Sequence, residues 1–125
     1  MADTVFEIGG VRVLECNANG IKLRSERDAV DIVGAALSQR CNLVVLPIER
    51  LNADFFSLKT RIAGEIIQKF VNYEVRLVII GDIARHADAS TALRDFVFET
   101  NRGSQVWFLA DRGELELRLG AKKPE

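Results

Sequence analysis

Lys59 and Asp82 are the two residues whose positions most suggest chemistry. Lys59 lies in the first turn of a helix predicted from about residue 54 to residue 73, and it falls within the apolar arc of that helix. Asp82 follows directly after a predicted strand over residues 75–80. Both positions belong to the edge where parallel strands end, which is where open α/β sheets bind ligands. An inward lysine there could hold a phosphate or carboxylate, or act as a desolvated base or Schiff-base nucleophile beside Asp82.

The alternative interpretation of Lys59 is structural, because its stem can cover the core while its ammonium reaches solvent. We nevertheless predict a binding surface at this upper edge. Its candidate residues are Ser57, Lys59, Thr60, Glu65 and Asp82.

The predicted helix over residues 54–73 also carries a row of small and branched side chains. This row consists of Thr60, Gly64, Ile67 and Val71. It would allow close approach of a second backbone, from a neighbouring helix or from a second copy of the chain. Glu65 stands four residues from both Arg61 and Lys69, which predicts surface ion pairs.

A second group of polar residues is predicted at the opposite, lower edge of the sheet, where helices end. It consists of Gln68, Asn72, Tyr73, Asn101 and Arg102. These residues either form a polar interaction patch or simply cap helices. In the capping interpretation, Gly103 adopts a left-handed conformation after a helix over residues 90–102.

The sequence gives no reason to expect a metal or another cofactor. Asp82, His86 and Asp88 match no ligand spacing, and aspartates are also common as caps. No glycine-rich phosphate loop, dinucleotide fingerprint or serine-hydrolase elbow is present. Cys16 and Cys41 lack paired spacing, so we predict two buried thiols.

The elements that must position these residues alternate along the chain. Two β-rich runs flank Gly9-Gly10, which predicts a hairpin, and apolar runs at 43–46, 75–80 and 105–109 predict buried strands. Helices are predicted from Ser25 to Arg40, over 54–73 and 90–102, and over 113–119. The order β-β-α-β-α-β-α-β-α predicts a single α/β domain over residues 1–125. We expect a mixed, mostly parallel five-stranded sheet with helices on both faces and a flexible tail over 120–125.

The overall composition is that of a globular domain. The chain has 125 residues, of which 48% are hydrophobic, and its formal net charge is -1. The balanced charge argues against nucleic acid as a partner, and no apolar run is long enough to span a bilayer. We therefore expect a cytoplasmic protein with no membrane association.

The run from Phe55 to Tyr73, together with Gly81-Asp82 and Glu99 to Gly103, resembles the bacterial domain-of-unknown-function 4180 family over most of the chain. This resemblance implies no biochemical activity. The element order is similar to the STAS fold of anti-sigma-factor antagonists. In that fold a phosphorylated serine occupies roughly the place of Ser57, although Asp54-Phe55-Phe56-Ser57 lacks the adjoining Asp-Ser pair.

The leading functional hypothesis is a non-enzymatic binding or regulatory domain that acts around Ser57, Lys59 and Asp82. Its partner would be a protein or a small anionic ligand. Two alternatives remain open: a small enzyme or anion sensor that uses Lys59 and Asp82, and a structural homodimer.

Overall fold

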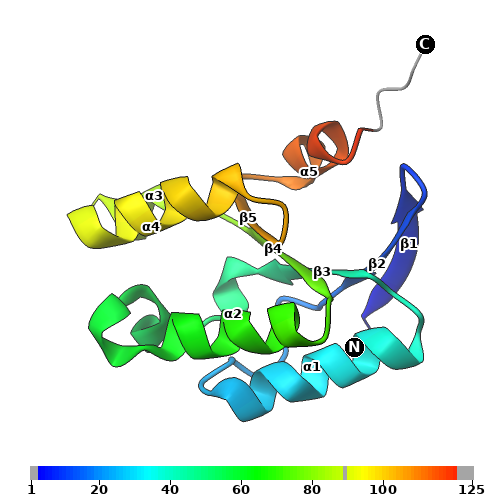
Figure 1. The fold of residues 1–125 in the computed structure, drawn as a ribbon, viewed down its shortest axis with the longest axis horizontal. Coiled ribbons are helices and arrows are strands. Elements are labelled where there is room, and N and C mark those ends of the chain that lie inside the picture. Colours follow the sequence, from blue (N-terminus) through cyan, green and yellow to red (C-terminus); the bar gives the residue numbers. More distant parts are fainter. Residues whose placement is uncertain (1–2, 89, 121–125) are drawn as a thin grey trace.

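The computed structural model describes residues 3–88 and 90–120 and contains one five-stranded sheet in the order β1-β2-β3-β4-β5 (Figure 1). The strands are β1 (Thr4–Ile8), β2 (Val11–Glu15), β3 (Leu43–Pro47), β4 (Arg76–Ile80) and β5 (Val106–Leu109). β1 pairs antiparallel with β2, and β2 to β5 are mutually parallel. The predicted α/β class and mostly parallel five-stranded sheet are confirmed.

The predicted hairpin joins β1 to β2 through Gly9 and Gly10. Their φ angles are 55° and 83°, a combination that side chains disfavour and glycine accepts. The turn sets Phe6 opposite Val13, which fixes the register of the pair. The predicted glycine turn is confirmed.

The helices are α1 (Glu26–Ser38), α2 (Ile62–Asn72), α3 (Ala84–Ala87), α4 (Thr91–Arg102) and α5 (Arg112–Arg118). Spatial strand order follows chain order, so successive right-handed crossovers place their helices on the same face. The larger core accordingly joins Ala36 of α1, Phe70 of α2 and Phe96 of α4 to one face of the sheet. Leu115 of α5 packs in a second core on the other face, beside Trp107. Helices therefore lie on both faces, as predicted.

The predicted long helix over residues 54–73 is wrong in its first half. Short 3-10 turns occupy Ala53–Phe56 and Leu58–Thr60, and α2 begins only at Ile62. Arg61 separates the turns from α2 with a left-handed φ of 68°. The Thr60 hydroxyl lies 2.7 Å from the Asp54 carbonyl oxygen and accepts a hydrogen bond from the Ile62 N–H.

One further prediction about a helix end needs correction. Gly103 has φ -86° and ψ -164°, which is extended rather than left-handed. Arg40 and Glu74 take left-handed conformations after α1 and α2 instead. Ser25 precedes α1 without a side-chain capping bond, and Asp28 accepts a hydrogen bond from the Arg24 N–H. Residues 121–125 of the predicted flexible tail lie outside the described residues.

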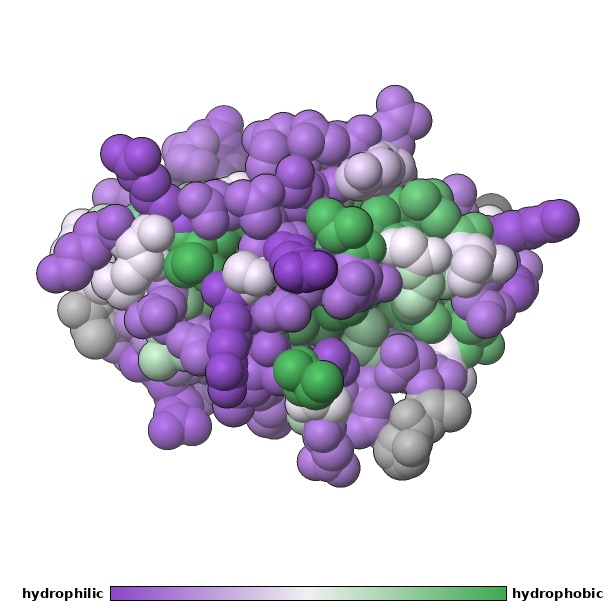
Figure 2. All heavy atoms as spheres, turned by 90° about the horizontal axis from the view of Figure 1, so that it is seen from below, coloured by the Kyte–Doolittle hydropathy of each residue, from purple (hydrophilic) through white to green (hydrophobic). Residues whose placement is uncertain are grey.

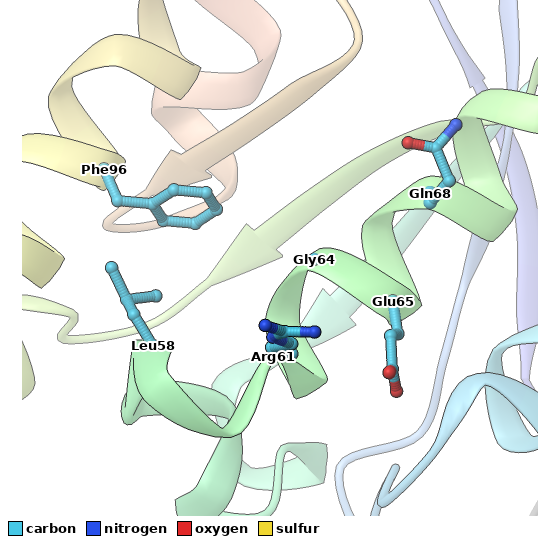
Figure 3. Close-up of a pocket in the computed structure, with 6 residues that line it drawn as sticks. All are labelled: Leu58, Arg61, Gly64, Glu65, Gln68 and Phe96. Carbon is cyan, nitrogen blue, oxygen red and sulfur yellow. The ribbon is translucent and has the colours of Figure 1, made fainter.

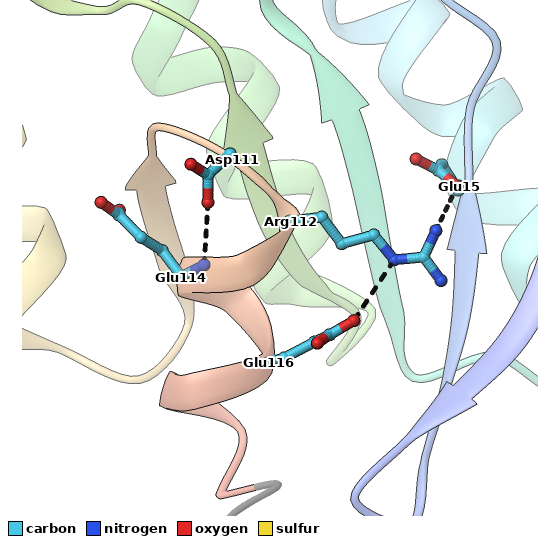
Figure 4. A network of polar contacts seen from close by, with 5 residues as sticks. All are labelled: Glu15, Asp111, Arg112, Glu114 and Glu116. Carbon is cyan, nitrogen blue, oxygen red and sulfur yellow. Dashed lines mark hydrogen bonds and ion pairs between the residues drawn. The ribbon is translucent and has the colours of Figure 1, made fainter.

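Arg112 also connects α5 to the strands on the second sheet face (Figure 4). Its guanidinium lies 3.6 Å from Glu15 on β2, 3.8 Å from Glu116 and 3.8 Å from the centre of the Phe6 ring. Asp111 caps the helix by accepting a hydrogen bond from the Glu114 N–H at 3.0 Å. One arginine thus connects the last helix to the first hairpin.

Two more arginines cover Trp107 on the same sheet face. The guanidinium carbons of Arg76 and Arg118 lie 4.7 Å and 4.2 Å from the centre of its ring. Burial lowers the pKa of Arg76, and the nearby charge of Arg118 lowers it further. The second core is therefore covered partly by charged side chains.

The surface seen from the side of α1 and α2 is mostly hydrophilic (Figure 2). Hydrophobic residues on this face form separate areas with hydrophilic side chains between them. Among residues 3–88 and 90–120, no helix has the length and apolar character that crossing a membrane requires.

Candidate binding groove between α2 and α4

A cavity with a volume of about 530 Å³ lies between α2 and α4 (Figure 3). Its walls are Leu58, Arg61, Gly64, Glu65, Gln68 and Phe96. A neighbouring cavity of about 360 Å³ is lined by Phe56, Ser57, Leu58, Lys59, Ser90 and Ala92. Because the two cavities share Leu58, we treat them as one feature, the α2–α4 groove. This groove is the candidate functional site.

One flank of α2 is covered and the other is open. On the covered flank, the Lys69 ammonium lies 3.1 Å from the Glu26 carboxylate of α1. On the open flank, a Cβ atom placed on Gly64 would meet no heavy atom within 4 Å. The prediction that a neighbouring helix approaches closely here is therefore wrong at Gly64. Contact with a second copy of the chain stays a prediction.

Leu58 and Phe96 form the apolar part of the groove. Figure 3 shows these two side chains pointing toward the same space, with Glu65 directed away from Phe96. Phe96 is held because its other side contacts Phe108 of β5, with ring centres 6.1 Å apart. A partly buried aromatic ring is therefore fixed at the groove wall by the core.

The charged residues of the groove differ from the predicted arrangement. Neither the Arg61–Glu65 nor the Glu65–Lys69 ion pair forms within the described residues, and Lys69 pairs with Glu26 instead. Arg61 is turned away from the helical register by its left-handed backbone. The groove consequently presents a guanidinium and a carboxylate that no described side chain neutralises.

Ser57 and Lys59 line the smaller cavity, whereas Asp82 is not among its wall residues. The Lys59 side chain is exposed and belongs to a 3-10 turn rather than to the first turn of α2. Asp82 is exposed and follows Gly81 at the end of β4. Asp82 therefore does not line the cavity that Lys59 lines.

The remaining predicted site residues are distributed along the helices. Gln68 donates a hydrogen bond to Asn72 at 2.8 Å on α2, and Tyr73 is 50% exposed. Asn101 accepts a hydrogen bond from the Phe108 N–H at 2.6 Å and donates one to the Phe108 carbonyl at 3.1 Å, which ties α4 to β5. Arg102 lies 3.8 Å from Glu99. Only Gln68 of this lower set reaches the groove.

Sequence reasoning missed two residues, Phe96 in the wall of the groove and the buried Arg50. Phe96 belongs to a predicted helix, and its spacing beside Leu93 and Val97 could have marked it as the edge of an apolar face. Arg50 follows a strand and resembles a surface residue in sequence, yet it is only 9% exposed. No described group of histidine, cysteine, aspartate and glutamate side chains is arranged to hold a metal ion.

The fold and site define a small α/β domain with the open α2–α4 groove on one face of its sheet. The chain belongs to the family described as Domain of unknown function (DUF4180), whose sequence model matches residues 8–119. No curated protein and no solved structure matches the chain. The similarity to the STAS fold therefore stays a prediction.

Proposed function

We propose that this chain is a non-enzymatic binding domain whose α2–α4 groove receives an amphipathic helix from a protein partner. The observation that carries this proposal is the open flank of α2 at Gly64, beside the apolar pair Leu58 and Phe96. Amphipathic helices commonly dock in such grooves through a few apolar side chains. The proposed partner places two such side chains against Leu58 and Phe96.

The spacing of the α2 wall supports a helix as the occupant. Gly64 and Glu65 lie four and three residues before Gln68 on α2, which is the spacing that one face of a helix presents to a packed neighbour, and Arg61 directly precedes this helix. The small residue at position 64 lets a second backbone come close. From Gly64 to Gln68 this wall extends for about 6 Å at about 1.5 Å per residue, which matches about one turn of a bound helix.

The charges at the rim specify the partner further. Arg61 and Lys59 lie toward the start of α2, and Glu65 follows one turn later. A complementary helix carries an acidic residue opposite Arg61 and a basic residue opposite Glu65. Such pairs at a solvated rim contribute mainly to orientation and association rate rather than to affinity.

The substitution Gly64→Leu tests the groove directly. A side chain at position 64 would enter open space, so the fold is retained, and replacing a helical glycine is itself favourable. We expect the introduced leucine side chain to occupy the groove and to weaken peptide binding at least tenfold. The probe is a set of 16-residue helical peptides selected from a displayed library against the wild-type chain, with affinity measured by titration calorimetry.

Gly34→Leu is the matched control. Gly34 lies within α1, and a Cβ placed on it also meets no heavy atom within 4 Å. This variant should bind the selected peptides as the wild type does. Equal binding by wild type and Gly64→Leu would contradict the proposal. Dimerisation of the wild type that Gly64→Leu abolishes would identify a second copy as the occupant and would also reject it.

A further inference from the structure

A separate cavity of about 320 Å³ lies at the edge where the parallel strands end. It is lined by Lys22, Ile48, Glu49, Leu51, Ala53, Phe56, Arg85 and His86. Lys22 comes from the segment after β2, Ile48 to Phe56 from the segment after β3, and Arg85 and His86 from α3 after β4. Three successive connections therefore bring cationic and apolar side chains to one place, the carboxyl-edge cavity.

The walls of the carboxyl-edge cavity are fixed by specific contacts between these connections. Leu23 forms a parallel bridge with Leu51, and the Lys22 ammonium donates a hydrogen bond to the Glu49 carbonyl at 2.8 Å. The rings of Phe56 and His86 are stacked, with centres 3.8 Å apart and planes 7° apart. These contacts place Lys22 and His86 without using all of their hydrogen-bond donors.

Gly81 explains how the segments after β3 and β4 come close together. Its φ is 151°, and a Cβ on it would lie 2.7 Å from the Ile48 Cβ. Only glycine leaves room for Ile48 at this point. Ile48 in turn forms part of the apolar side of the carboxyl-edge cavity.

The polar side of the carboxyl-edge cavity retains hydrogen-bond donors that no other described group uses. Within the described residues, no hydrogen bond or ion pair involves the Arg85 guanidinium, the His86 ring or the Glu49 carboxylate. Lys22 uses one donor of its three for the Glu49 carbonyl. The wall contains two cationic side chains, Lys22 and Arg85, and one carboxylate, Glu49, so its net charge is positive.

We propose that the carboxyl-edge cavity binds a small organic phosphate. Lys22 and Arg85 hold the phosphoryl oxygens, since lysine binds phosphate as a point charge and arginine can bind it with two parallel N–H groups. Ile48, Leu51, Ala53 and Phe56 contact the organic part. The volume of about 320 Å³ lies at the lower end of the range for small-ligand sites, which fits a compact ligand.

Phenyl phosphate is the probe, because it combines a dianionic group with a small apolar ring. We expect saturable binding by titration calorimetry, with affinity at least tenfold above that of inorganic phosphate. Arg85→Met should weaken it at least tenfold, and Lys22→Met should do the same. The Arg85 side chain is exposed and makes no hydrogen bond or ion pair with the part of the chain that the structure describes, so its variant should remain folded.

Arg27→Met is the matched control, because Arg27 is an exposed arginine on α1 that lines none of these cavities. It should bind phenyl phosphate as the wild type does, as should Gly64→Leu, which separates this site from the groove. Binding of benzoate as tight as phenyl phosphate would overturn the phosphate assignment in favour of carboxylates. Wild-type affinity in Arg85→Met, or no binding by the wild type at millimolar probe, would overturn the site.

Discussion

Arg50 shows how one buried charge can organise a connection. Its Nε donates to the Ile21 carbonyl at 2.7 Å, and its Nη1 donates to the Asn17 carbonyl at 2.8 Å. No described carboxylate lies within ion-pair distance of this guanidinium. Burying a charge is costly unless hydrogen bonds compensate it, so the two carbonyls are essential partners. Arg50 thereby fixes the segment after β2 to the 3-10 turn Ile48–Arg50 that follows β3.

Gly20 makes this arrangement possible, which leads to a first prediction. A Cβ on Gly20 would lie 2.6 Å from the Arg50 Cζ, so Gly20→Ala must shift the guanidinium and weaken its hydrogen bonds to the two carbonyls. We expect Gly20→Ala to lower the free energy of unfolding by about 1–3 kcal/mol, the range for buried groups that lose their partners. Urea denaturation followed by circular dichroism measures this change.

A double-mutant cycle identifies the cause of that loss. In an Arg50→Met background the guanidinium is absent, so Gly20→Ala should cost much less than it does in the wild type. Equal costs in both backgrounds would show that Gly20 is required for a reason unrelated to Arg50.

At the scale of elements, α1 and α2 end in the same way. After α2, the Val75 N–H donates to the Phe70 carbonyl and the Glu74 N–H donates to the Val71 carbonyl. After α1, Cys41 and Arg40 make the equivalent bonds to Ala36 and Leu37. This pattern is the Schellman motif, in which a left-handed residue follows the helix and a buried apolar residue comes next. Glycine usually occupies the left-handed position, but here Glu74 and Arg40 do.

Glu74→Gly should therefore stabilise the protein. The φ angle of Glu74 is 59°, which costs a residue with a Cβ atom about 1–2 kcal/mol, whereas glycine adopts this conformation freely. The greater freedom of glycine in the unfolded chain offsets about 0.4–1 kcal/mol of that gain. We expect the free energy of unfolding to rise by up to about 1.6 kcal/mol, measured by urea denaturation.

Gly103→Ala is the reciprocal control, because Gly103 has an extended backbone. A Cβ atom placed on Gly103 would lie 3.6 Å from the Thr100 carbonyl oxygen, which is an ordinary contact distance. Alanine should be tolerated there. A large loss of stability in Gly103→Ala, or in Glu74→Gly, would contradict the assignment of the left-handed positions.

Elements with a strong periodic pattern were predictable, whereas their ends often were not. The hairpin at Gly9-Gly10 and the buried run of β3 follow from local residue types. The break at Arg61 does not, because arginine favours helix and nothing local marks a left-handed residue. Thr60 and the short turns before it are stabilised by contacts that only the folded chain provides.

At the scale of the whole molecule, sequence reasoning located one side of the candidate site but not its shape. Ser57, Lys59, Glu65 and Gln68 line the groove, all on the segment that was singled out. Phe96 belongs to another helix, and pairing it with Leu58 requires the relative positions of α2 and α4. The carboxyl-edge cavity was missed for the same reason, since Lys22 and Arg85 meet only through three separate connections.

The buried thiol of Cys16 should make the stability of the whole molecule decrease at alkaline pH. Burial is the largest cause that raises the pKa of its thiol from 9.0 to about 12, with Asp3 and Glu15 adding to the rise and Arg50 opposing it. The unfolded chain therefore releases this proton near pH 9, whereas the folded chain retains it until about pH 12. Since the folded state binds more protons in this window, its stability is fully present below pH 9 and falls as the pH rises.

The expected loss from this one thiol between pH 8 and pH 10.5 is about 2 kcal/mol, because each pH unit within the window corresponds to about 1.4 kcal/mol. Urea denaturation at several pH values measures it. Cys16→Ala should flatten the decline by about this amount, even though the smaller side chain lowers stability at neutral pH. The same change at the other buried cysteine, Cys41→Ala, leaves the Cys16 thiol in place and should retain the steep decline. Parallel pH profiles for the wild type and Cys16→Ala would show that Cys16 does not control the alkaline limit of the fold.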